Sequence, residues 1–308
     1  MSLVDAAAIT TRLAQFVGAA VLCGGGLFFV YGVTPDQRAR WPTRMIRLAA
    51  GLGALGTMGW LMAKTAEIGD APADAFHPGT VWSVAADTGF GRVALARLGL
   101  FLLALVLSYG QRRGGGLWLI LALVGAAASA SFVWTGHGVR DQGLVGLVHA
   151  AADMLHLLAA ATWVGALAVM AVLAWIAGRP DAAHRAGQDA LAGLVRFSAI
   201  GLGVVGVLTA SGLVNSWLLI GAAGLGRVLT TAYGQTLVAK LVLFGLMLAL
   251  AAANRYRITP QLQRALEGDA GARHFRPVLA SILTETGLAV LVLGLVSWLG
   301  TLSPTIDG

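Results

Sequence analysis

Long runs of apolar residues alternate along the chain with short polar segments, and the runs are long enough to cross a bilayer, which takes roughly 20 residues in a helix. Prolines and clusters of charge fall between the runs or at their ends, where helices stop. The short alternating segments of a membrane β-barrel are not seen. The pattern predicts an all-α polytopic membrane protein, an eight-transmembrane-helix bundle. The predicted spans are 10–34, 44–66, 91–110, 116–135, 145–177, 194–220, 234–256 and 277–300.

Composition agrees with this assignment. Of the 308 residues 57% are hydrophobic and only 11% are charged, whereas soluble domains carry about 25% charged residues. The 42 glycines suit close contact between helices in lipid. We expect residues 1–308 to form a single transmembrane domain without a soluble domain. The lone cysteine, Cys23, excludes an internal disulfide; we interpret it as a small residue at a helix contact, with a thiolate ligand as the alternative.

The basic residues predict the orientation of the bundle. Arginines concentrate in the segments after the first, third, fifth and seventh spans, and such segments face the cytoplasm. They are Arg38, Arg40, Arg44, Arg47, Arg112, Arg113, Arg179, Arg185, Arg196, Arg255, Arg257, Arg264, Arg273 and Arg276. The other segments are poorer in basic residues, and 67–88 is acidic. The prediction is N-out and C-out, in the inner membrane of a bacterium with both termini in the periplasm. We therefore read the net charge of +7 as a topology signal and not as nucleic-acid binding.

Ionisable residues share one face of the fifth span. His149, Asp153 and His156 stand at i, i+4 and i+7 of a helix that must lie in lipid. A charged Asp near the bilayer centre costs roughly 2.5–3.5 kcal/mol, so such residues face the protein interior and usually mark a pathway. Imidazole and carboxylate ligands suit copper or zinc. The alternative for these three residues is a structural polar network.

Further candidate ligands lie at a similar predicted depth. His137 sits in the outer loop just before the fifth span, and Met58 and Met62 lie one turn apart in the outer half of the second span. Thioethers favour Cu(I), although the methionines also suit simple core filling. Lys240 is expected to pair with Asp153 or to extend outward. Glu285, toward the inner side, has two readings, a relay on the exit side or a partner for an arginine.

Several motifs, taken in order, resemble the copper resistance protein D (CopD) family of inner-membrane proteins. They are Trp-Thr-Gly-His at 134–137, His-x-x-x-Asp-x-x-His-Leu-Leu-Ala-Ala-x-x-Trp-Val-Gly at 149–165, Ser-Gly-Leu-Val-Asn-Ser-Trp at 211–217, Tyr-Gly-Gln-Thr-Leu-Val-Ala-Lys-Leu at 233–241 and Gly-Thr-Leu-Ser-Pro at 300–304. The resemblance implies an eight-helix copper-handling protein, often encoded with periplasmic copper carriers. Some members carry a periplasmic copper-binding domain that this chain lacks. A separate carrier protein, or free ion, would then present the copper.

The leading hypothesis is copper uptake from periplasm to cytoplasm. The path opens at His137 and continues through His149, Asp153 and His156, with Met58 and Met62 as further ligands. Imidazoles in series hand an ion onward without an over-tight site. Because protons compete for histidine nitrogens, binding is expected to weaken as the pH falls through the ordinary histidine pKa of about 6.5. The copper ion, Cu(I) or Cu(II), is the expected ligand, and its oxidation state is open.

Two other functions stay open at this stage. One is a haem-binding membrane electron-transfer protein, although His149 and His156 share a helix and axial histidines normally face each other from different helices. The other is a membrane scaffold that holds copper for delivery without transporting it. We do not expect an enzyme, because the sequence shows no Ser/His/Asp set, no acid pair and no cofactor fingerprint at matching depth.

Overall fold

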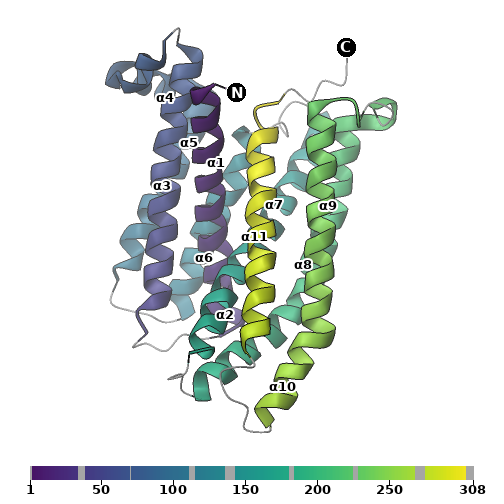
Figure 1. The fold of residues 1–308 in the computed structure, drawn as a ribbon. Helices are drawn as coiled ribbons and strands as arrows, with labels where there is room; N and C mark the ends of the chain where they lie inside the picture. The colour runs from purple at the N-terminus through teal and green to yellow at the C-terminus, as the bar shows by residue number, and fades with distance from the viewer. Residues whose placement is uncertain are drawn as a thin grey trace.

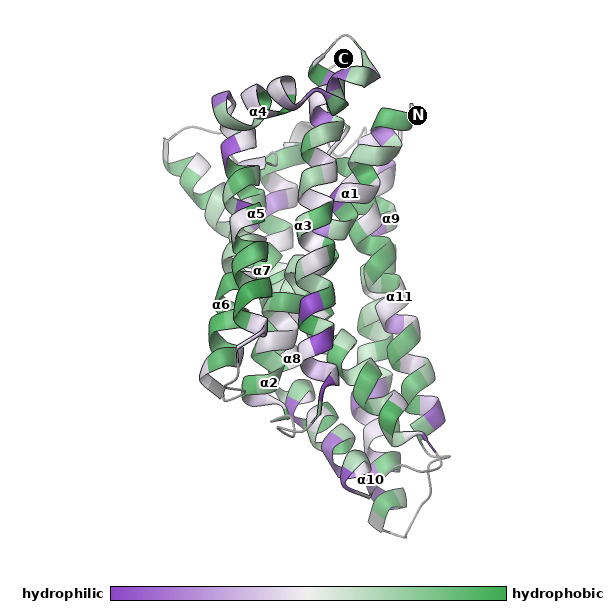
Figure 2. Cartoon of the chain, turned by 90° about the vertical axis from the view of Figure 1, so that its left-hand side faces the viewer, coloured by the Kyte–Doolittle hydropathy of each residue, from purple (hydrophilic) through white to green (hydrophobic). Residues whose placement is uncertain are grey.

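In a computed structural model, the chain is a bundle of long helices with both ends of the described chain at one end of the bundle (Figure 1). The structure describes residues 2–33, 39–69, 71–110, 115–135, 143–179, 184–224, 228–267 and 275–302. Within these residues, eight helical spans are long and apolar enough to cross a membrane, which confirms the predicted all-α polytopic architecture. Apolar residues cover the middle of the bundle, and hydrophilic residues concentrate toward its two ends (Figure 2).

Six of the spans have bounds near the predicted ones. Some are single helices, and others consist of helices joined by a short π-helical or 3₁₀ turn. The first is α1 (Leu3–Ala20), a π-helical turn η1 (Val21–Gly25) and α2 (Gly26–Tyr31), and the next is α3 (Trp41–Ile68). The third and fourth are α5 (Gly89–Ser108) and α6 (Gly115–Ala130), which continues into the short η3 (Ser131–Thr135). The fifth is α7 (Gly143–Ala177), and the last is α11 (Phe275–Leu299).

The sixth and seventh spans are longer than the sequence predicted. The sixth, α8 (His184–Gly224), changes direction at Gly221, whose φ of 63° favours glycine. The seventh continues from α9 (Ala232–Ala253) through a π-helical turn, η6 (Asn254–Ile258), into α10 (Thr259–Glu267). Pro260 lies in the first turn of α10, directly after the π-helical turn, and the helix passes the proline without ending.

The acidic 67–88 segment is not a plain loop. It contains a short 3₁₀ turn, η2 (Pro72–Phe76), and a helix, α4 (Pro78–Asp87). Val84 and Ala85 of α4 pack on Leu61 of α3, which buries a small apolar cluster at the end of the bundle where the termini lie. Because α4 carries few polar residues, its sequence lacks the alternation that marks an amphipathic helix.

Helix α7 is the centre of the bundle, because it packs against η1, α8 and α11. Its crossing with the first span depends on two glycines. A Cβ on Gly165 would lie 2.3 Å from the Ala20 carbonyl oxygen, and one on Gly24 would lie 2.2 Å from the Ala161 carbonyl oxygen. The small residues therefore let the two backbones touch, as is common for helices in membranes. Cys23 is buried next to Gly125 of α6, which agrees with its interpretation as a small residue at a helix contact.

Candidate functional site

The three ionisable residues of α7 line one cavity of about 200 Å³, which we call the histidine pocket. His149, Asp153 and His156 form one wall, and residues of α1, α8, α9 and α11 close the others. His149 is buried, with 2% of its surface exposed. The pocket lies in the half of the bundle nearer the termini, because α7 begins at that end (Figure 1). Helical spacing therefore brings the three side chains together in a buried polar space within an apolar bundle.

His156 is held in one tautomer by helix α8. Its Nδ1 atom lies 3.2 Å from the Leu208 carbonyl oxygen and 3.1 Å from Ser211 Oγ. A carbonyl oxygen only accepts hydrogen bonds, so Nδ1 carries the proton and Nε2 keeps its lone pair. Gly212 leaves room for the ring, since a Cβ there would lie 3.3 Å from His156 Cε1. A histidine whose one nitrogen donates to a carbonyl oxygen is oriented as metal-ligating histidines usually are.

Asp153 is surrounded by positive side chains. Arg12 of α1 and Lys240 of α9 both line the histidine pocket, and their charges act on the Asp153 carboxylate. Asn215 Nδ2 donates a long hydrogen bond of 3.5 Å to Asp153 Oδ1. Lys240 makes no ion pair within 4.0 Å with a described carboxylate. A cation entering this pocket therefore competes with Arg12 and Lys240 for one carboxylate.

The other predicted ligands are not brought to this pocket. Met58 of α3 has 50% of its surface exposed, and neither Met58 nor Met62 lines the histidine pocket. His137 lies outside the described residues. Among the residues that the structure describes, no three His, Cys, Asp or Glu side chains form a group ready to hold a metal ion. The pocket thus offers separate donors along a wall, and not a closed coordination shell.

Sequence reasoning missed a buried arginine beside the histidine pocket. Arg97 of α5 is 1% exposed, and its guanidinium donates hydrogen bonds to Gln15 Oε1 (2.8 Å), Ser131 Oγ (2.7 Å) and Thr135 Oγ1 (3.1 Å). The guanidinium also stacks on the Phe132 ring at 3.8 Å. Its signal in the sequence was an arginine well inside the third predicted span, a costly position that needs partners.

Two further cavities continue along α7 toward the α10 end of the bundle. The first, the connecting pocket, has a volume of about 240 Å³ and shares His156 and Lys240 with the histidine pocket. The second, the glutamate pocket, has a volume of about 230 Å³ and is lined by Glu285 of α11. Trp163 of α7 lines both. The three cavities therefore adjoin one another in series through shared side chains.

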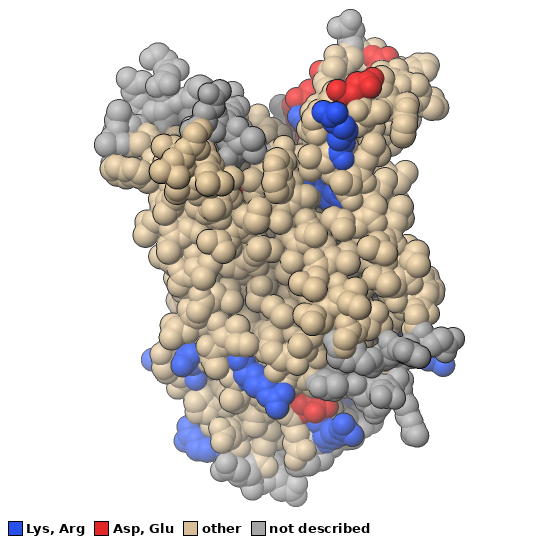
Figure 3. Space-filling view, turned by 180° about the vertical axis from the view of Figure 1, so that it is seen from behind, with Lys and Arg blue, Asp and Glu red and all other residues tan. Residues whose placement is uncertain are grey.

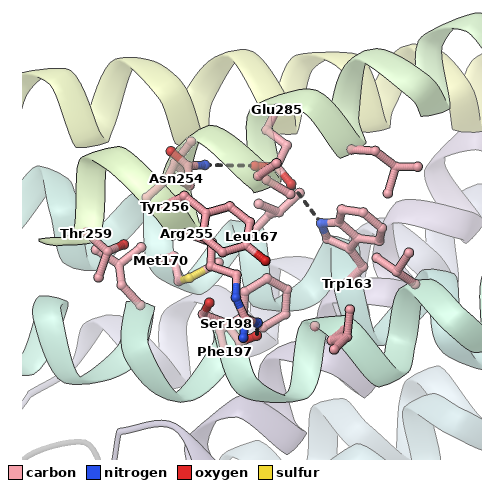
Figure 4. Close-up of a pocket in the computed structure, with 18 residues that line it drawn as sticks. Trp163, Leu167, Met170, Phe197, Ser198, Asn254, Arg255, Tyr256, Thr259 and Glu285 are labelled. Atoms are coloured by element: carbon pink, nitrogen blue, oxygen red, sulfur yellow. Dashed lines mark hydrogen bonds between the residues drawn. The ribbon is translucent and has the colours of Figure 1, made fainter.

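Glu285 makes no ion pair within 4.0 Å with a described arginine, the kind of partner that the sequence suggested as one alternative. It accepts hydrogen bonds from Trp163 Nε1 to Oε1 (2.9 Å) and from Asn254 Nδ2 to Oε2 (3.1 Å), as Figure 4 shows. With 2% of its surface exposed, it is one of the most deeply buried polar residues of the bundle.

These features define a class: a polytopic helical membrane protein with ionisable residues along a buried, cavity-lined face. Two family models match the chain, "Copper resistance protein D-like, N-terminal domain" over residues 3–147 and "Copper resistance protein D" over residues 191–299. The chain is 32% identical to copper resistance protein D of Pseudomonas syringae pv. tomato, with 98% of each chain covered. The chain belongs to the copper resistance protein D family.

Two other relatives extend the comparison. The inner membrane protein YebZ of Escherichia coli (strain K12) is 28% identical, with 96% of this chain and 98% of the relative covered. The copper transport protein CutJ of Bacillus subtilis (strain 168) is 31% identical over 80% of this chain and 45% of the longer relative. No solved structure matches the chain. The eight apolar helices and these relatives identify a multi-pass inner membrane protein.

Proposed function

We propose that this protein moves copper ions across the inner membrane, from periplasm to cytoplasm, through the histidine pocket, and that it acts without a catalytic step. The observation that carries the proposal is the wall of His149, Asp153 and His156 in a cavity of a membrane bundle, where His149 is buried and the other two are partly buried. Two relatives whose names refer to copper resistance and copper transport support copper as the ion. Imidazole nitrogens are good copper ligands, and a carboxylate offsets part of the ion's charge.

The proposed direction needs an orientation, and the surface charge supports N-out and C-out. Arginines and lysines are more numerous at the end of the bundle opposite the termini, where an acidic patch also lies, and most acidic residues lie with a few basic ones at the α4 end (Figure 3). An excess of basic residues marks the cytoplasmic side of inner membrane proteins. In this orientation the histidine pocket lies in the periplasmic half of the bundle.

The described geometry favours transient binding of the ion. His156 presents Nε2 as a ligand atom, since Nδ1 is occupied by the Leu208 carbonyl oxygen and Ser211. Arg12 and Lys240 lower the attraction of the Asp153 carboxylate for a further cation, because their positive charges act on the same group. Conduction requires sites that an ion can leave as well as enter. In the account proposed here, a periplasmic copper carrier or free ion supplies the copper at the outer end.

Copper accumulation in cells tests this proposal. Cells expressing the wild type are expected to contain several times more copper than cells with an empty vector at the same external copper concentration. The double variant His149→Ala/His156→Ala should return copper to the vector level. His77→Ala is the matched control, because His77 is exposed at the start of α4 and does not line the histidine pocket. Membrane abundance of each variant is measured in parallel.

Two outcomes would contradict uptake. Equal accumulation by the wild type and the double variant would remove these histidines from the path. Unchanged total copper in wild-type cells, with copper bound to the purified protein, would favour a delivery scaffold. A haem Soret band in the purified protein would favour electron transfer, although no described residue lining the histidine pocket is a histidine from another helix.

A further inference from the structure

The glutamate pocket lies in the half of the bundle away from the termini, between α7, α8, η6 and α11 (Figure 4). Its wall combines apolar side chains with a small set of polar and sulfur atoms, contributed by Glu285, Asn254, Met170, Ser198 and Thr259. Pockets of this composition are typical ligand sites, because the apolar wall excludes water and the few polar groups fix the ligand.

Glu285 lacks a positive partner in this pocket. Both of its described hydrogen-bond donors, Trp163 Nε1 and Asn254 Nδ2, are neutral. Arg255 is the one cationic side chain among the described lining residues, and its guanidinium donates to the Ser198 carbonyl oxygen instead. A carboxylate buried in a membrane bundle with neutral partners only is costly in its charged form. A bound cation would offset that charge.

Asn254 supplies an unpaired acceptor to the same pocket. Its Oδ1 atom is buried and has no hydrogen-bond partner in the described structure. A buried unpaired carbonyl oxygen costs about 1–3 kcal/mol, so its persistence needs an explanation such as an absent ion. Asn254 opens the π-helical turn η6, and such turns frequently occur at functional sites. An unpaired amide oxygen of Asn254 and the carboxylate of Glu285, which has only neutral donors, therefore belong to residues that line one cavity.

The donor set suits a cation with some affinity for sulfur. A carboxylate and an amide oxygen accept positive charge, and the thioether of Met170, which lines the same pocket, is a soft ligand that favours Cu(I). The connecting pocket links this site to the histidine pocket, because Trp163 lines one end of it and His156 the other. An ion that leaves His156 toward the α10 end passes through the connecting pocket and then reaches the glutamate pocket.

We propose that the glutamate pocket is a second copper-ion site, built from Glu285, Asn254 and Met170, which receives the ion from the histidine pocket on its way across the membrane. The inference rests on the proposed copper transport for the identity of the ion. Trp163 separates the two sites and holds Glu285 through its indole N–H. Mutation of Trp163 would therefore disturb both the connecting pocket and the position of Glu285.

Copper binding by the purified protein in detergent tests the second site. Cu(I) is titrated under a reductant against a Cu(I) chelator of known affinity, with wild type, Glu285→Gln, His149→Ala/His156→Ala and the triple variant. Glutamine matches glutamate in shape, and its amide can pair with both Trp163 and a rotated Asn254 amide, so the fold is expected to persist. Thermal unfolding of each protein checks this expectation.

The expected stoichiometry is about two copper ions for wild type, about one for each of the two site variants and none for the triple variant. Wild-type stoichiometry and affinity in Glu285→Gln would overturn the second site. Loss of one ion in Glu285→Gln, with full binding in the histidine variant, would keep the second site and remove the histidine pocket from the proposed function. The two failures are therefore distinguishable.

A second variant covers a failure of Glu285→Gln to fold. Asn254→Leu keeps the size of the side chain and removes the unpaired Oδ1 atom. It is expected to weaken the binding of one ion about tenfold, which is within the range for supporting groups around a metal. Unchanged binding of both ions by folded Asn254→Leu would overturn the proposed ligand set.

Discussion

The bundle contains two kinds of buried polar residue. In the region of α1, α3 and α5, the Arg97 guanidinium donates hydrogen bonds to three side chains and stacks on an aromatic ring. In the region of α7, α9 and α11, Lys240 makes no hydrogen bond or ion pair with a described residue within bonding distance, and Glu285 has no positive partner. The donors of Arg97 are satisfied by contacts within the fold. Lys240 and Glu285 instead line cavities of the bundle.

Packing differs between the first span and three helices that border the cavities. The first span, whose π-turn crosses α7 at Gly24 and Gly165, is largely buried, whereas few residues of α8, α9 and α11 are buried. Helices that must form a site for a passing ion cannot all pack as tightly as those that form the scaffold. In the proposed function, the first region stabilises the bundle and the second binds the copper ion.

The largest effect is expected at Arg97. Arg97→Ala removes three hydrogen bonds and leaves a cavity, while Ser131 and Thr135 keep their bonds to backbone carbonyl oxygens. Gln15 Oε1 loses its described donor. An unpaired buried acceptor and a cavity together cost about 3–5 kcal/mol. Thermal unfolding in detergent measures the loss, with Lys240→Ala as the control that should change stability by less than about 1 kcal/mol. Equal losses of stability in Arg97→Ala and Lys240→Ala would contradict the proposed difference between the two regions.

A smaller loss of stability is expected at the helix crossing. Gly165→Ala forces a Cβ against the backbone of the first span, at 2.3 Å from the Ala20 carbonyl oxygen, and overpacking of this kind costs about 1–3 kcal/mol. Gly203→Ala in α8 is the matched control, because no atom lies within 4 Å of its added Cβ. The same unfolding assay compares them. A Gly165→Ala protein as stable as Gly203→Ala would show that α7 is not tightly held.

A smaller effect, on copper affinity, is expected when the charge around Asp153 is changed. Lys240→Met removes a cation that acts on the Asp153 carboxylate and keeps an apolar side chain of similar length. Copper in the histidine pocket is expected to bind at least about tenfold more tightly, because the substitution removes the repulsion between two positive charges. Chelator competition measures the affinity. Weaker binding instead would mean that Lys240 holds Asp153 in place for the ion.

The sequence was sufficient for the scaffold and for one wall of the site. Apolar runs predicted eight spans, and helical spacing predicted that His149, Asp153 and His156 share a face. Spacing along one helix does not reveal which neighbour the face meets. Contacts made across helices, such as His156 with Leu208 or Glu285 with Trp163, therefore appeared only in the structure.

Short segments and buried charge were harder to interpret. Helix α4 carries too little alternation to stand out, and it was predicted as a loop. The arginine at position 97 lay inside a predicted span, but its partners come from three other segments of the chain. The methionines at 58 and 62 had the right depth, yet the helix α3 turns Met58 outward. Depth along a helix can be counted from the sequence, whereas the direction of a side chain depends on tertiary packing.

The most direct test of copper transport is flux into proteoliposomes that contain only the purified protein and a trapped copper indicator. The account predicts saturable copper entry with the wild type, loss of that entry with His149→Ala/His156→Ala, and full entry with the control Met58→Leu/Met62→Leu, whose side chains do not line the histidine pocket. Equal entry with wild type and the histidine variant, or no entry with a wild type that binds copper, would contradict it.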